Sequence, residues 1–211
     1  FNLDLKNGVL TQTDPTGHFL VGGSVVRTNG YINAALTRDI LIQGSYVFDV
    51  GTENGYSPVR ADLTFMDFAN VTVKANQTAQ PNISDPSKAL SRHWSLGGSA
   101  GLEADLTFHY LDSDIPATAN EQNFAIVKYD GTAFSQQPGV IDTAANTFRV
   151  NDITDYYGDW TLVEPGVLFT PTVTGTPTNT LTSTPTNTAT ATPTATSTPS
   201  EYRAEFDYDG D

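Results

Sequence analysis

The sequence predicts an all-β fold, an antiparallel β-sandwich, followed by a disordered Thr/Pro-rich linker. Three observations support this prediction. Apolar and polar residues alternate over short segments, glycine-containing turn dipeptides separate these segments, and the composition changes abruptly after Phe169. Alternation with a period of two is typical of strands with one buried face. Short strands at this spacing are typical of antiparallel sandwiches.

The clearest strand lies at residues 102–111. Its apolar face carries Leu102, Ala104, Leu106, Phe108 and Tyr110, and its polar face carries Glu103, Asp105, Thr107 and His109. A helix would scatter these residues around its circumference. The pattern therefore predicts a strand that packs on one side and meets water on the other.

Weaker alternation predicts four more strands, at residues 45–50, 124–129, 147–150 and 159–162. The dipeptide Asp130-Gly131 follows the second of these strands. It predicts a hairpin whose two-residue turn leads into residues 132–134. Three Asn-x-Ser/Thr sequons, at Asn70, Asn76 and Asn82, lie in one polar stretch, which predicts a surface loop.

These patterns divide the chain into an all-β region at 1–169, a linker at 170–200 and a short acidic segment at 201–211. The all-β region could also comprise a short upstream module at 1–30 and a sandwich at 31–169. In the linker, threonine occupies every even position from 170 to 198, and prolines interrupt the odd positions. Such a segment has no apolar face to bury and predicts an extended spacer of up to roughly 90 Å, at ~3.1 Å per residue.

Composition limits the partners. Twenty-four acidic residues against ten basic residues give a net charge of −14, so nucleic acid and anionic membrane surfaces are unfavourable partners. No apolar run reaches the ~18–20 residues needed to cross a bilayer, so we expect no membrane insertion. The chain has no cysteine, which excludes disulfides, thiolate metal sites and cysteine nucleophiles.

Three carboxylates alternate at the end of the chain, on Asp207, Asp209 and Asp211. Calcium takes six to eight oxygen ligands, and a loop with acids at its first, third and fifth positions can direct them inward. Gly210 permits the sharp turn that such a loop requires. The spacing predicts a calcium loop, of which this chain carries only the first half.

Residues 206–211, Phe-Asp-Tyr-Asp-Gly-Asp, resemble the opening of the FG-GAP (VCBS, integrin-α-like) repeat, whose loop has the pattern Asp-x-Asp-Gly-Asp-Gly-x-x-Asp. The resemblance implies calcium as the cofactor of the intact parent protein, with Asp207, Asp209 and Asp211 as its first three acidic ligands. The remaining ligands would follow residue 211. We therefore expect the chain to be a fragment, and the absence of an initiator methionine agrees with this expectation.

Two segments of the all-β region also resemble surface-exposed β modules of large secreted bacterial proteins that carry such repeats. They are Gly30-Tyr-Ile-Asn-Ala-Ala-Leu-Thr-Arg38, with Tyr46–Gly51 and Gly55–Val59 after it, and Asp159-Trp-Thr-Leu-Val-Glu-Pro-Gly166. The resemblance implies an accessory module of an exported protein. It carries no catalytic or ligand residues.

Other candidate residues have plainer interpretations. His18, His93 and His109 lack ligand spacing, and we expect solvated side chains. Asp112 and Asp114 follow a strand and predict a solvated loop, with a weak cation site as the alternative. Trp94 and Trp160 could form a platform for sugars, but aromatic residues on strands more often belong to the core.

The sequence therefore predicts a non-catalytic structural or adhesion module of a secreted or cell-surface protein, which tethers a calcium-binding repeat domain. Its partner would be a cell-surface glycan or protein. The alternative is a carbohydrate-binding accessory module of a secreted hydrolase. No Ser/His/Asp arrangement or carboxylate pair supports a hydrolase within this chain itself.

Overall fold

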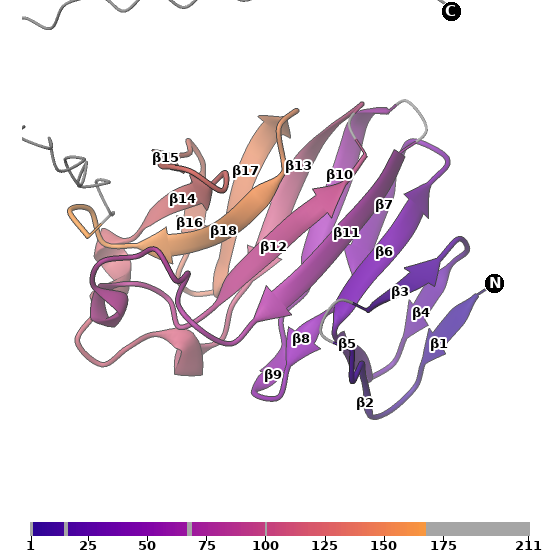
Figure 1. Cartoon of the computed structure of the whole chain (residues 1–211), viewed down its shortest axis with the longest axis horizontal. Helices are drawn as coiled ribbons and strands as arrows, with labels where there is room; N and C mark the ends of the chain where they lie inside the picture. Colours follow the sequence, from indigo (N-terminus) through magenta and orange to yellow (C-terminus); the bar gives the residue numbers. More distant parts are fainter. Residues whose placement is uncertain (1, 15–16, 67–68, 100, 168–211) are drawn as a thin grey trace, which may run out of the picture. The chain divides into compact units, whose positions relative to one another are not determined.

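The structure is a computed structural model, and it describes residues 2–14, 17–66, 69–99 and 101–167. All of them belong to a unit that spans residues 1–172. Figure 1 shows that strands account for most of this unit and run in two main sheets. The only helices in the described part are three single-turn 3₁₀ helices, η1 (Pro86–Lys88), η2 (Asp112–Asp114) and η3 (Glu121–Asn123). None of them is long and apolar enough to cross a membrane.

The larger sheet has seven strands. In spatial order they are β15 (Phe134–Gln136), β14 (Ala125–Tyr129), β18 (Gly158–Val163), β12 (His93–Gly98), β11 (Ala69–Asn76), β6 (Ala35–Ile40) and β3 (His18–Val21). Every neighbouring pair is antiparallel except β3 and β6, which are parallel.

The smaller sheet has five strands. In spatial order they are β16 (Val140–Asp142), β17 (Thr147–Ile153), β13 (Leu102–His109), β10 (Val59–Met66) and β7 (Ser45–Phe48). All of its pairings are antiparallel. The predicted all-β, largely antiparallel sandwich is confirmed.

Three two-stranded ladders complete the described fold. β1 (Leu3–Leu5) pairs in parallel with β4 (Val25–Arg27), and β2 (Val9–Thr11) pairs in parallel with β5 (Tyr31–Asn33). β8 (Gly51–Thr52) and β9 (Gly55–Tyr56) form an antiparallel pair. The parallel pairs were not expected from the sequence, because parallel pairing between short strands leaves no turn signal beside them.

The core lies between the two sheets, and aromatic rings fill its centre. Phe108 and Phe148 stack with their centroids 4.5 Å apart, and Trp94 meets both rings edge-on at 5.4 and 5.6 Å. Trp160 lies 5.7 Å from Phe108. These four side chains are completely buried. Burial of such rings removes a large apolar area from water and fixes the spacing of the sheets.

The predicted strands are present with small shifts. The segment 102–111 contains β13, whose residues alternate between buried and half-buried as the pattern predicted. Segments 45–50, 124–129, 147–150 and 159–162 correspond to β7, β14, β17 and β18.

Two local predictions are wrong. The hairpin between β14 and β15 is present, but its loop has four residues, because Asp130 N–H bonds the carbonyl of Ala133. Asp130 Oδ1 also accepts from the Thr132 N–H and the Ala133 N–H, and this Asx-type turn replaces the expected two-residue turn. Asn70 and Asn76 lie on β11, in the middle of the larger sheet, instead of in a loop.

Candidate functional site

The acidic residues of the predicted calcium loop, Asp207, Asp209 and Asp211, lie outside the described residues. The calcium site therefore stays a prediction. Within the described ranges, no group of three or more histidine and acidic side chains is arranged to hold a metal ion.

The three histidines lie on three different strands. His18 is exposed on β3, and His93 on β12 is buried with its Nδ1 2.8 Å from the carbonyl oxygen of Thr78. His109 belongs to the other sheet, on β13. Full solvation was predicted for all three, and that is wrong for His93 and for the half-buried His109.

His109 has an unusual environment. Its Nδ1 is buried and makes no hydrogen bond to the described residues. Burial lowers the pKa of the imidazole, and the positive charge of Arg92 lowers it further, whereas Asp114 opposes the shift. The neutral imidazole is therefore the favoured form in the folded protein.

The prediction of a solvated loop or weak cation site at Asp112 and Asp114 is wrong for Asp114. η2 places Asp112 at the surface, where its Oδ1 accepts from Asn146, but it turns Asp114 into the interior. The Asp114 side chain has no exposed area. A carboxylate so enclosed needs an internal partner for its charge.

Arg92 is that partner. Its Nε lies 2.5 Å from Oδ2 of Asp114, and its Nη2 lies 3.1 Å from Oδ1, so the guanidinium grips both carboxylate oxygens. The Leu111 N–H donates to Oδ2 at 2.9 Å, and Gln77 Nε2 donates to Oδ1 at 3.1 Å. Four donors thus saturate the carboxylate, which leaves no lone pair for a cation.

The sequence contains a signal for Arg92 that was missed. Arg92, Trp94 and Leu96 have the same parity, so a strand that turns Trp94 into the core also turns Arg92 inward. The guanidinium completes its hydrogen bonds with Gln77 Oε1 at 2.7 Å and with Thr52 Oγ1 at 3.2 Å. Nothing in the sequence marks Gln77 and Thr52, because their roles depend on pairing between distant segments.

A polar cleft of about 390 Å³ lies over this network on the outer face of the larger sheet. Its walls are formed by Asn33, Thr52, Glu53, Lys74, Ala75, Asn76, Gln77 and Thr78. Thr52 and Gln77 belong to both the cleft and the network, so the buried ion pair fixes two of the cleft's walls. This cleft is the candidate functional site of the described residues.

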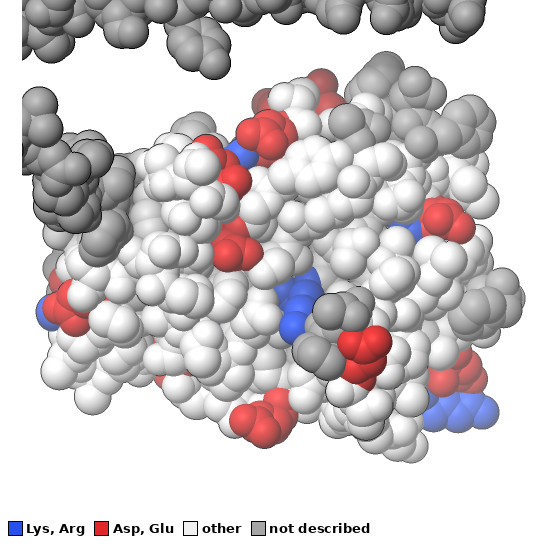
Figure 2. All heavy atoms as spheres, in the orientation of Figure 1, with Lys and Arg blue, Asp and Glu red and all other residues white. Residues whose placement is uncertain are grey.

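A second hollow of about 230 Å³ shares Asn33 and Lys74 with the cleft. Side-chain amides, hydroxyls, one amine and one carboxylate line the cleft, and no aromatic ring does. This set can donate and accept hydrogen bonds, but it offers no stacking surface. Figure 2 shows that charged side chains are sparse on this face of the molecule.

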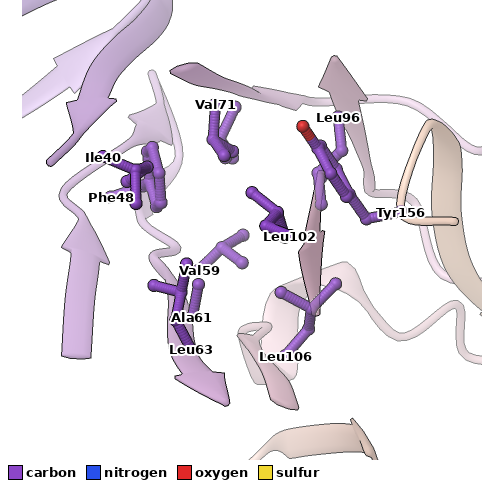
Figure 3. Close-up of a pocket in the computed structure, with 11 residues that line it drawn as sticks. Ile40, Phe48, Val59, Ala61, Leu63, Val71, Leu96, Leu102, Leu106 and Tyr156 are labelled. Carbon is purple, nitrogen blue, oxygen red and sulfur yellow. The ribbon is translucent and has the colours of Figure 1, made fainter. Parts of the chain in front are cut away.

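The gap between the sheets is not a ligand site. Figure 3 shows apolar side chains from both sheets, with Tyr156, around this gap, which has a volume of about 10 Å³. A space of this size holds one water at most, and its apolar walls would not bind it. The gap is a small packing imperfection of the core.

Neither tryptophan can form a sugar platform. Trp94 and Trp160 have no exposed area, and their Nε1 atoms donate to the carbonyl oxygens of Ser57 and Tyr156 at 3.0 and 2.9 Å. Both indole rings are therefore committed to the core, as the plainer interpretation predicted. A glycan site on this unit would have to use other residues.

Comparison of the chain with protein-family models, with curated proteins and with solved structures finds no match. The findings support a mostly-β domain without assigning it to a family.

Proposed function

We propose that the chain is a non-catalytic structural or adhesion module of an exported surface protein, whose Thr/Pro tract tethers a calcium-binding repeat. The observation that carries the proposal is the order of the three parts along the sequence. A β unit comes first, an uncharged Thr/Pro tract follows, and an Asp-rich segment comes last. Tracts of this composition are typical of surface stalks.

The chemistry of the β unit supports a structural role. Its most deeply buried charged groups, Arg92 and Asp114, satisfy each other with additional hydrogen bonds from Gln77 and Thr52. Such a network stabilises one arrangement of the loops that meet there, since each partner would be costly to leave unpaired. The tryptophans likewise serve the core.

The calcium part of the proposal depends on the resemblance of residues 206–211 to FG-GAP repeats. Asp207, Asp209 and Asp211 would supply oxygen ligands, and calcium would stabilise the repeat that they open. The tether would then separate this repeat from the β unit by up to roughly 90 Å at ~3.1 Å per residue.

Limited proteolysis of the 211-residue chain tests the tether. A protease of broad specificity should cut first between residues 170 and 200 and leave a resistant fragment close to 1–169, identified by mass spectrometry. The extended tract should be accessible, since it has no apolar face to bury. Resistance of this tract, or first cleavage within the strands, would contradict the proposal.

The polar cleft supports a second candidate, recognition of a glycan by an accessory module of a secreted hydrolase. Amides and hydroxyls match sugar hydroxyl groups, although the absence of a ring from the cleft wall weakens the match. Glycan-array binding by the full chain, lost in Lys74→Ala and Asn33→Ala but kept in Thr107→Ala, would favour this candidate. Thr107 lies on β13 of the other sheet and provides the control. Absence of binding to any glycan would exclude it in favour of the structural role.

A further inference from the structure

The N-terminal strands form two stacked coils. β1, β2 and β3 pair in parallel with β4, β5 and β6, in the same order along the chain. Leu3 pairs with Val25 and Leu10 pairs with Ile32, so the same step of 22 residues separates the first two pairs of strands. Parallel, in-register stacking at such a step is the geometry of a β-solenoid, in which each coil contacts only its neighbours.

Figure 1 shows these strands gathered at one end of the unit, where the chain begins. The second coil joins the sandwich firmly. The guanidinium of Arg27 lies 3.6 Å from the ring centroid of Tyr56, and the Tyr56 hydroxyl donates to Asp49 at 2.6 Å. On the larger sheet β6 pairs antiparallel with β11, so parallel stacking ends there. The sandwich therefore caps the solenoid on one side.

The other side of the solenoid is open. Among the described residues, β1 and β2 each have one strand partner, and β3 is the last strand of the larger sheet. Strands with one free edge invite pairing with another strand. β2 (Val-Leu-Thr) and β3 (His-Phe-Leu-Val) contain none of the lysines or prolines with which proteins usually block such edges.

An aliphatic stack shows which neighbour is missing. Leu10 lies on Ile32, and Ile32 lies on Val50 through a parallel bridge, so the three residues occupy equivalent positions in successive layers. Ile32 and Val50 have no exposed area, whereas 38% of Leu10 is exposed. The difference arises because Ile32 has a layer on each side and Leu10 has only one. A further layer at the same step would bury Leu10.

We propose that the edges of β1, β2 and β3 are the docking surface for another coil of parallel β-solenoid. Its occupant is an extended polypeptide of about one 22-residue step, with three strands in register and aliphatic residues at the inward positions. A single added strand would cover only one of the three edges, and it would leave Leu10 exposed unless it paired with β2. A full coil covers all three edges and extends the aliphatic stack.

The test is an extended chain with a second copy of residues 1–22 placed ahead of Phe1. This insertion sets the new coil 22 residues from the old one. It also keeps three residues between the end of the copied β3 and Leu3, the number that now joins Val21 to Val25. Amide hydrogen exchange in β1, β2 and β3 should slow by at least about tenfold relative to the parent chain. Exchange in β13 reports whether both proteins are folded.

The control chain carries the same copy with its Leu10 and Phe19 positions changed to aspartate, which removes inward apolar groups without changing length. It should give no added protection. Equal exchange of β1–β3 in the parent and extended chains, with β13 protected in both, would overturn the proposal. Concentration-dependent dimers of the parent chain that protect the same edges would also overturn it, because they would assign the surface to a second copy.

Discussion

Nε of Arg92 lies 2.5 Å from Oδ2 of Asp114, and neither side chain has any exposed area. The pair joins η2 to the start of β12, and through Gln77 and Thr52 it reaches the wall of the polar cleft. A buried ion pair of this kind need not be more stable than a well-packed apolar pair, but removal of one partner leaves an isolated charge. This relationship gives the first prediction.

Asp114→Ala and Arg92→Met should each lower the free energy of unfolding by about 3–5 kcal/mol, because each leaves one buried charge without its counter-charge. The double variant Arg92→Met/Asp114→Leu should lose less than the sum of the two single losses. Urea unfolding followed by tryptophan fluorescence measures all three. Single losses below about 1 kcal/mol would show that the pair is unimportant for stability.

Trp94→Ala and Trp160→Ala should each destabilise the fold by about 3–5 kcal/mol, because each leaves a large cavity among Phe108 and Phe148. Phe65→Ala is the control. Its ring is 58% exposed, and we expect a change within about 0.5 kcal/mol. Thermal unfolding measures these effects, and equal effects for buried and exposed rings would contradict the assigned core.

His109 should make stability depend on pH. Its pKa is lowered in the fold by burial, so the unfolded chain binds the proton more readily. By linkage, the stabilising contribution is fully present above the unfolded pKa of about 6.5 and is lost as the pH falls through the lower folded pKa. His109→Gln should reduce the fall in stability between about pH 7 and pH 5. A wild-type stability that rises over this interval as pH falls would contradict the assignment.

Asp130 should titrate far below an ordinary aspartate. Hydrogen bonds from the Thr132 hydroxyl, the Ala133 N–H and the Thr132 N–H lower its pKa to about 2. The charged carboxylate therefore stabilises the hairpin above the unfolded pKa of about 4, and this contribution is lost as the pH falls towards 2. Carbon-13 NMR of the Asp130 carboxyl during an acid titration measures it directly. A midpoint near 4 would show that the turn does not form as described.

The extent to which the sequence predicts this fold depends on the size and contrast of the alternating residues. β13 alternates large apolar residues with charged ones, and it is recognised at once. β11 alternates Ala69, Val71, Val73 and Ala75 with polar residues just as regularly. Small side chains and asparagines reduce the contrast there, so the same period is easily taken for a loop.

The candidate site is less predictable than the strands. The parity of Arg92 with Trp94 indicates that it points inward, but its pairing with Asp114 depends on η2, which has no periodic signal. Likewise, the alignment of Leu10 with Ile32 follows from backbone pairing across a step of 22 residues, and no repeated motif marks it. Contacts of this kind are set by the tertiary structure.

The most direct test of the account is a ¹H–¹⁵N NMR spectrum of the 211-residue chain recorded with and without millimolar calcium. We predict rapid amide exchange at residues 170–200, slow exchange in β13, and weak calcium-dependent shifts confined to residues 206–211, because this chain holds only the first half of the calcium loop. Protected amides throughout residues 170–200, or calcium-dependent shifts centred on the β unit, would contradict the account of a tether that separates a calcium repeat from a structural module.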